Sequence, residues 1–93
     1  MKKCVHIFVQ GQVQGVYFRA YTEKRAVELN LAGWVRNRRD GRVEIMAEGS
    51  EAELKEFLDW CSTGSPHSHV EHVDATWIQC EQDFNTFSVT QSK

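Results

Sequence analysis

The sequence of 93 residues predicts an α+β fold in which two helices pack on one face of an antiparallel sheet. Three observations predict this class. Apolar residues alternate near the N-terminus, recur at helical spacing in two later segments, and flank an Asp-Gly pair that is typical of a β-hairpin. A hydrophobic fraction of 41% is enough for one core in a chain of this length, so we expect a single domain over residues 1–93.

The first strand and the first helix are distinguished by the period of their apolar residues. Residues 3–10 (KCVHIFVQ) carry β-branched and aromatic side chains with period two, which predicts a strand. Residues 20–32 have helical spacing, and Gly33 follows where a terminating glycine is expected. The predicted apolar stripe of this helix consists of Ala20, Val27 and Leu31, widened by Tyr21, Ala26 and Leu29.

A hairpin and a second helix come next. Residues 34–37 (WVRN) and 43–49 (VEIMAEG) predict two antiparallel strands joined by the Asp-Gly turn. Ser50 and Glu53 form a capping box, which predicts the start of the second helix, and we expect this helix to end near Gly64. Its predicted apolar face consists of Leu54, Phe57, Leu58 and Cys61.

The end of the chain predicts two further strands. Residues 70–80 read as a strand in which the alternation breaks between Val70 and Val73, and this break indicates a bulge. Residues 84–90 (FNTFSVT) predict a short final strand.

The order of these elements is that of a ferredoxin-like βαββαβ sandwich with an additional short C-terminal strand. In this topology the first and second strands run parallel with the third between them. The loop at residues 11–19 and the end of the second strand at Asn37 then lie on the same edge of the sheet. We therefore expect Arg19 and Asn37 to face a common ligand.

The loop before Arg19 has the composition of an anion site. Its glycines allow several backbone N–H groups to turn inward, and the following helix adds its positive end. The planar guanidinium of Arg19 matches two phosphate oxygens at once, which a lysine cannot do. From these residues alone, a glycine-rich turn with a solvated arginine remains an open alternative.

Two segments resemble the signature blocks of the acylphosphatase family. They are GQVQGVYFR at residues 11–19 and GWVRNRRDGRVEIMAEG at residues 33–49, in the family's order and separation. The resemblance implies hydrolysis of the carboxyl-phosphate bond of acyl phosphates without a metal or cofactor. It also implies that Arg19 and Asn37 are the catalytic residues. The implied phosphate cradle is the backbone of Gln14, Gly15, Val16, Tyr17 and Phe18.

The chemistry of an acyl phosphate fits these residue types. Its carboxylate leaving group needs no general acid, so the site must only neutralise the phosphoryl oxygens and hold a water in line. Arg19 and the loop amides would do the first, and the carboxamide of Asn37 would do the second. We expect the proton of the water to pass to a phosphate oxygen of the substrate.

The sequence departs from the family pattern at two places. Tyr17 occupies a variable position, where it could alter how the acyl group sits, and SPHSHVEHV introduces three histidines. The spacing of His67, His69 and His72 could bind zinc, but we expect solvated surface side chains.

Several other side chains receive a structural interpretation. We expect Cys4, Cys61 and Cys80 to be reduced thiols, with one disulfide as the less favoured alternative. The remaining expectations are solvent-facing carboxylates at Asp74, Glu81 and Asp83, and core or core-edge tryptophans at Trp34, Trp60 and Trp77.

Charge and composition limit the partners. The net charge of −2 does not favour nucleic acid or an anionic membrane, and no apolar run is long enough to span a bilayer. We expect a cytoplasmic monomer acting on a small acyl phosphate. A regulatory domain of the same fold and an RNA-binding module are the alternatives, the latter because of Arg36, Arg38, Arg39 and Arg42.

Overall fold

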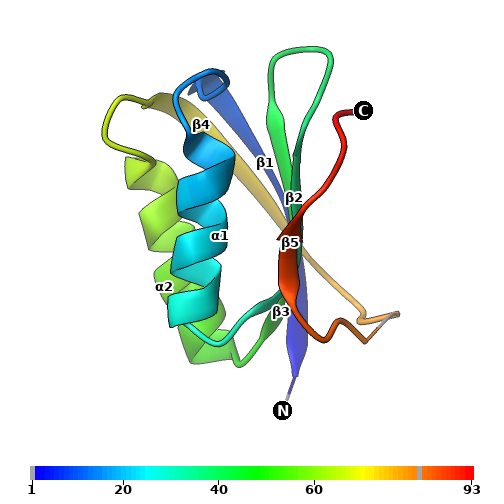
Figure 1. Ribbon diagram of the computed structural model, residues 1–93. Helices are drawn as coiled ribbons and strands as arrows, with labels where there is room; N and C mark the ends of the chain where they lie inside the picture. The colour runs from blue at the N-terminus through cyan, green and yellow to red at the C-terminus, as the bar shows by residue number, and fades with distance from the viewer. Residues whose placement is uncertain (1, 82) are drawn as a thin grey trace.

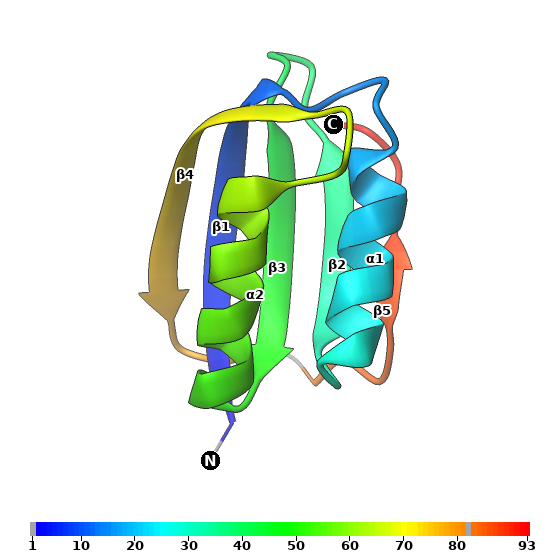
Figure 2. The same cartoon turned by 90° about the vertical axis from the view of Figure 1, so that its left-hand side faces the viewer.

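The computed structural model describes residues 2–81 and 83–93 and has two layers, a sheet and a pair of helices. Figure 1 and Figure 2 show both helices on one face of the sheet, while the other face is uncovered. The prediction of a ferredoxin-like sandwich is confirmed. The elements are β1 (Lys3–Gln12), α1 (Phe18–Glu28), β2 (Ala32–Asn37), β3 (Val43–Gly49), α2 (Glu51–Thr63), β4 (His69–Ile78) and β5 (Phe87–Val89).

The sheet has the strand order β4-β1-β3-β2-β5. As predicted, β3 lies between β1 and β2 and is antiparallel to both. The four longer strands form the predicted antiparallel sheet, and the short C-terminal strand β5 adds to it in parallel with β2, so the whole sheet is mixed. The reason is topological: β4 runs opposite to β1 and therefore to β2, so a chain that reverses direction after β4 must run parallel to β2.

The bulge predicted in β4 is present. Gln10 pairs with His72 and Gly11 pairs with Val70, so Glu71 is the extra residue. This extra residue allows both Val70 and Val73 to pack against the core. Gly11 has a φ of 128°, and a Cβ there would collide with the carbonyl oxygen of His69, so the close approach requires glycine.

The boundaries and the buried face of α1 differ from the prediction. The helix ends at Glu28, and Asn30, with a φ of 59°, makes the turn that was assigned to Gly33. Of the predicted stripe, Ala26, Leu29 and Leu31 are buried, whereas Ala20, Tyr21 and Val27 are exposed. The helix buries Phe18 and Thr22 in their place. Thr22 can be buried because its hydroxyl donates to the carbonyl of Phe18 at 2.7 Å.

Helix α2 agrees with its prediction. The Ser50 hydroxyl accepts a hydrogen bond from the Glu53 amide at 3.3 Å and donates one to the Glu53 carboxylate at 2.9 Å. Gly64, with a φ of 76°, follows the last helical residue. The buried residues of α2 are Leu54, Phe57 and Cys61, and Leu58 packs partly buried beside them.

The core lies between the helices and the covered face of the sheet. Trp60 packs against Phe18 and Phe57, with ring centroids 5.5 and 6.2 Å apart, and Trp34 is half-buried. Trp77 was expected in the core or at its edge, but on the outer strand β4 it is 44% exposed.

In the part of the chain that the structure describes, no helix is long and apolar enough to cross a membrane.

The expectation of three reduced thiols is wrong for two of them. Cys4 and Cys80 form a disulfide with a Cα–Cα distance of 5.4 Å. Their separation of 76 residues hides this pairing in the sequence, but Cys4 lies opposite Ile78 on β4, two residues before Cys80. Cys61 is free and buried, and burial raises the pKa of its thiol.

Candidate active site

The loop between β1 and α1 bends sharply at two residues. Gly15 has a φ of 75°, and Tyr17 has a φ of 60° and a ψ of 22° in the left-handed region. A side chain at Gly15 would meet open space, so the constraint on this residue is its backbone conformation. Tyr17 adopts the same region as a non-glycine residue, which costs on the order of 1–2 kcal/mol. Its side chain is 77% exposed.

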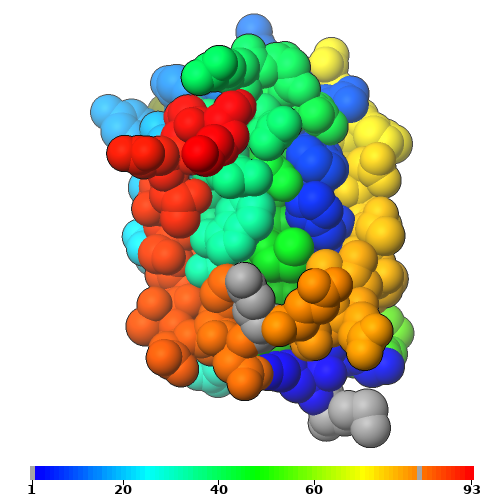
Figure 3. Space-filling model, turned by 90° about the vertical axis from the view of Figure 1, so that its right-hand side faces the viewer, coloured from blue at the N-terminus to red at the C-terminus, as the bar shows by residue number. Residues whose placement is uncertain are grey.

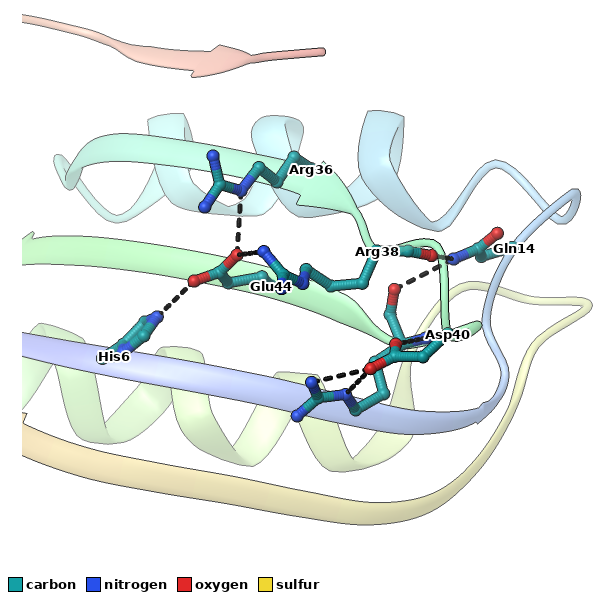
Figure 4. A network of polar contacts seen from close by, with 7 residues as sticks. His6, Gln14, Arg36, Arg38, Asp40 and Glu44 are labelled. Carbon is teal, nitrogen blue, oxygen red and sulfur yellow. Dashed lines mark hydrogen bonds and ion pairs between the residues drawn. The ribbon is translucent and has the colours of Figure 1, made fainter. Parts of the chain in front are cut away.

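Hydrogen bonds hold this loop from two sides. The side-chain amide of Gln14 donates to the carbonyl oxygens of Arg38 at 2.8 Å and Arg42 at 2.9 Å, in the β2–β3 hairpin (Figure 4). From the other side, the hydroxyl of the buried Ser65 donates to the carbonyl of Val16 at 3.0 Å. These hydrogen bonds fix the loop to the hairpin and to the segment after α2.

At the N-terminus of α1, no capping side chain or acidic residue offsets the positive end of the helix. Tyr17 is the N-cap and makes no side-chain cap hydrogen bond, and the first turn contains no acidic residue. The first N–H groups of a helix have no acceptor within the helix, and they lie at its positive end. Phe18 anchors this end because its ring is buried against Trp60. The turn can thus offer N–H groups to an anion.

Arg19 and Asn37 line the same pocket, which has a volume of about 470 Å³. Arg19 is the second residue of α1 and Asn37 is the last residue of β2, so the topology brings them to one edge as expected. Six of the seven site residues named from the sequence line this pocket: Gln14, Gly15, Tyr17, Phe18, Arg19 and Asn37. The seventh, Val16, packs partly buried against the core.

The carboxamide of Asn37 is fixed near the pocket with one unused acceptor. Its side-chain oxygen is buried and has no hydrogen-bond partner among residues 2–81 and 83–93. Its backbone carbonyl accepts from the amide of Lys93 at 2.9 Å, which holds the end of β2 in place. A buried acceptor without a donor costs about 1–3 kcal/mol, so rotation of this side chain toward a water or ligand in the pocket is favoured.

Comparison with known proteins identifies the family of this chain. The family model described as Acylphosphatase matches residues 5–89. The chain belongs to the acylphosphatase family. An acylphosphatase of Marinobacter nauticus is 49% identical over 85 residues, which are 91% of this chain and 92% of the relative.

Solved acylphosphatase structures have the same fold. The crystal structure of acylphosphatase from Bacillus subtilis has a TM-score of 0.92 and 42% identity, covering 97% of this chain and 99% of that one. The structure of an acylphosphatase from Coxiella burnetii has a TM-score of 0.92 and 37% identity, covering 96% of this chain and 93% of that one.

The site residues named from the sequence leave out four that line this pocket: Val13, Ala20, Glu23 and Val89. Glu23 lies four residues after Arg19 and therefore on the same face of α1, so helical spacing could have found it. Val89 comes from β5, and no local pattern connects it to a loop about 70 residues earlier. Its place in the pocket follows from the parallel pairing of β5 with β2.

Three of the four hairpin arginines, Arg36, Arg38 and Arg42, form ion pairs with carboxylates. The buried Glu44 accepts hydrogen bonds from Arg36 Nε at 2.8 Å and Arg38 Nη1 at 3.1 Å, and it lies 2.6 Å from His6 Nε2 (Figure 4). Arg42 pairs with Asp40 at 2.7 Å. This pairing weakens the alternative of an RNA-binding surface.

These ion pairs shift the acidity of both carboxyl groups. Burial by itself would raise the pKa of Glu44, but the hydrogen bonds and charges of Arg36 and His6 outweigh it and hold this pKa below its ordinary value. The hydrogen bonds and charge of Arg42 lower the pKa of Asp40. Both carboxylates are therefore ionised around neutral pH.

Proposed function

We propose that the loop amides, Arg19 and Asn37 together carry out the acyl phosphate hydrolysis of this acylphosphatase. The observation that carries the proposal is the shared pocket, which the first turn of α1 lines together with Arg19 and Asn37. The substrate is a small molecule with a carboxyl-phosphate bond. The products are a carboxylate and inorganic phosphate.

The phosphoryl group binds between the loop and Arg19. The amides of residues 14–18 donate to its oxygens, the helix contributes its positive end, and the guanidinium adds a bidentate pair of hydrogen bonds. Because Gln14 and Ser65 already hold the loop, little reorganisation is needed when the phosphate binds. These donors neutralise the charge on the equatorial oxygens in the transition state.

The attacking water binds at Asn37. When the side chain turns toward the pocket, its oxygen, unpaired in the free protein, accepts a hydrogen from this water and orients a lone pair toward phosphorus. A new P–O bond forms to the water while the bond to the carboxylate oxygen breaks, and the electron pair leaves with the carboxylate. The proton of the water passes to a phosphate oxygen, since a carboxamide is not a base.

The direct test is release of phosphate from acetyl phosphate, or from an aromatic acyl phosphate, in the presence of EDTA. We expect turnover in wild type, a loss of at least about 1,000-fold in Arg19→Ala, and a loss of about 100-fold or more in Asn37→Ala. Circular dichroism would confirm that both variants are folded. Wild-type activity in Asn37→Ala would remove the assignment of the water site.

We further propose that the protein is a single domain that acts as a monomer in the cytoplasm. One chain supplies all the residues that line the pocket, so no second copy is required to complete the site. Size-exclusion chromatography with light scattering, at the concentration of the activity assay, should give the mass of one chain. A dimer as the only active species would contradict this.

A further inference from the structure

The uncovered face of the sheet has a second groove, at the end of the sheet that is remote from Asn37. Figure 3 shows this face, with the segment that follows β4 crossing its lower end. The groove has a volume of about 250 Å³, and its wall includes Cys4, Trp34, Met46 and Phe84. No step of the proposed hydrolysis uses these residues.

Three metal-ligand groups gather next to this groove, and one of them, Cys4, also lines it. The sulfurs of Cys4 and Cys80 and one carboxylate oxygen of Glu48 lie within 4.8 Å of one another. Among residues 2–81 and 83–93 this is the one group of three or more such side chains that could hold a metal ion. Cys4 and Glu48 are opposite each other on β1 and β3, and the disulfide brings Cys80 to the same point.

The two oxygens of the buried Glu48 have different surroundings. One accepts a hydrogen bond from the amide of Phe84 at 3.2 Å and lies 3.6 Å from the ammonium of Lys2. The other faces the sulfur of Cys4 at 3.9 Å. A disulfide sulfur carries no hydrogen, so in the oxidised protein this sulfur cannot donate a hydrogen bond to the carboxylate.

We propose that reduction of the Cys4–Cys80 disulfide creates a binding site for one Zn²⁺ ion, with Cys4, Cys80 and Glu48 as ligands. A dithiol reductant supplies two electrons and two protons, so the S–S bond becomes two thiols and the reductant becomes a disulfide. When Zn²⁺ binds, each thiol releases its proton to solvent, and two Zn–S bonds and one Zn–O bond form.

The geometry suits a tetrahedral ion. Zn–S bonds of about 2.3 Å and Zn–O bonds of about 2.1 Å place the donor atoms about 3.5–3.8 Å apart. The distance from Cys4 to Glu48 is already close to this range. Cys80 is only partly buried, and rotation of its side chain can separate the two sulfurs across Cα atoms that are 5.4 Å apart.

Charge and orientation also favour this ion. Two thiolates and one carboxylate carry a charge of −3, which Zn²⁺ reduces to −1, and the ammonium of Lys2, which also pairs with Asp83, lies beside Glu48. The Phe84 amide and Lys2 hold the outer oxygen of Glu48, as supporting groups commonly do for metal ligands. The fourth ligand is then a water on the open side of Cys80.

The experiment compares reduced and oxidised wild type, so it depends on no variant. Each form is freed of metal and reductant under argon and titrated with Zn²⁺ against a chromogenic chelator. Titration with Co²⁺ then reports thiolate ligands by their charge-transfer absorption. We expect one tightly bound ion in the reduced form and at least 100-fold weaker binding in the oxidised form. Equal binding by the two forms would overturn the proposal.

Variants then test the ligands. Cys61→Ser removes the buried third thiol and is the matched control, so it should bind like reduced wild type. Cys80→Ser should lose tight binding, and Glu48→Gln should weaken it at least tenfold while keeping the shape of the side chain. Circular dichroism checks the fold of each variant. Wild-type affinity in Glu48→Gln, or loss of binding in Cys61→Ser, would overturn the proposed set of ligands.

Discussion

The side chain of Arg19 illustrates how much of this site can be predicted from single residues. A guanidinium at the end of a glycine-containing loop indicated an anion site, and the pocket contains that residue together with Asn37. The carboxamide was predictable only through the family resemblance and the topology, because an asparagine at the end of a strand has no distinctive local pattern. Glu23 was missed although its helical spacing from Arg19 was visible.

Replacement of Arg19 by lysine tests whether the shape of the cation matters. Lysine keeps the charge but offers a point donor instead of a planar fork, so it cannot bind two phosphate oxygens in the same way. We expect kcat/KM for acetyl phosphate in Arg19→Lys to fall at least about 100-fold. Steady-state kinetics would measure this ratio, with Lys24→Arg, at an exposed position on the same helix, as the control variant. Near-normal activity would show that charge alone suffices.

Glu23 tests the prediction that no general acid takes part. Its carboxylate lines the pocket, so it should repel a phosphate dianion, but a carboxylate leaving group needs no proton from it. In Glu23→Gln we expect kcat to stay within about twofold of wild type and KM to fall, since one like charge is removed. A drop in kcat of tenfold or more would make Glu23 a participant in proton transfer.

At the scale of elements, the strands and α2 followed the sequence closely, while α1 did not. The period of α2 and its capping box are both local signals, and both are correct. Helix α1 buries Thr22 and exposes Val27. Thr22 can be buried because its hydroxyl donates a hydrogen bond to the backbone carbonyl of Phe18, whose own side chain is buried at the start of the helix. Which side of a helix is buried depends on contacts with other elements, and the sequence of the helix alone does not specify them.

The ion-pair network of Glu44 joins three strands, so it should contribute to acid stability. In the folded protein the pKa of Glu44 is held below its ordinary value of 4.5. A depressed carboxyl pKa adds stability that is fully present above pH 4.5 and is lost as the pH falls through the folded-state pKa. We expect Glu44→Gln to lower the free energy of unfolding at pH 7 by about 1–3 kcal/mol.

This difference between Glu44→Gln and wild type should shrink as the medium is acidified below pH 4.5, because wild-type Glu44 then becomes neutral as well. Urea unfolding followed by tryptophan fluorescence from pH 3 to pH 8 would measure it. Glu56→Gln on the exposed face of α2 is a matched control and should change little. A difference that is constant over this range would exclude the ionised carboxylate as the source.

At the scale of the whole molecule, the Cys4–Cys80 disulfide is the feature that sequence reasoning judged wrongly. Cysteine spacing favours a disulfide only when pairs are regular or numerous, and neither holds here. The bond closes a loop of 76 residues, which includes most of the chain. Only the strand register, with β4 beside β1, brings the two residues together.

Closure of such a long loop should stabilise the protein mainly by restricting the unfolded chain. We expect reduction in the presence of EDTA to lower the free energy of unfolding by about 2–4 kcal/mol. Acyl phosphate hydrolysis at 25 °C should remain within about twofold, because the disulfide is at the opposite end of the sheet from Asn37. Urea titrations of both forms measure the first quantity, and Cys80→Ser, which should not respond to reductant, is the control. Identical unfolding midpoints in the two forms would contradict this account.

The two ends of the chain differ in a way that matters for fusion proteins. Residues 90–93 run along β2, where Thr90 donates to Val35 and Lys93 donates to the carbonyl of Asn37. Lys3 begins β1 at the other end of the sheet, as the termini in Figure 1 also show. An affinity tag or fluorescent reporter attached after Lys93 would therefore crowd the edge that we propose receives substrate, whereas the same tag placed before β1 would leave it accessible.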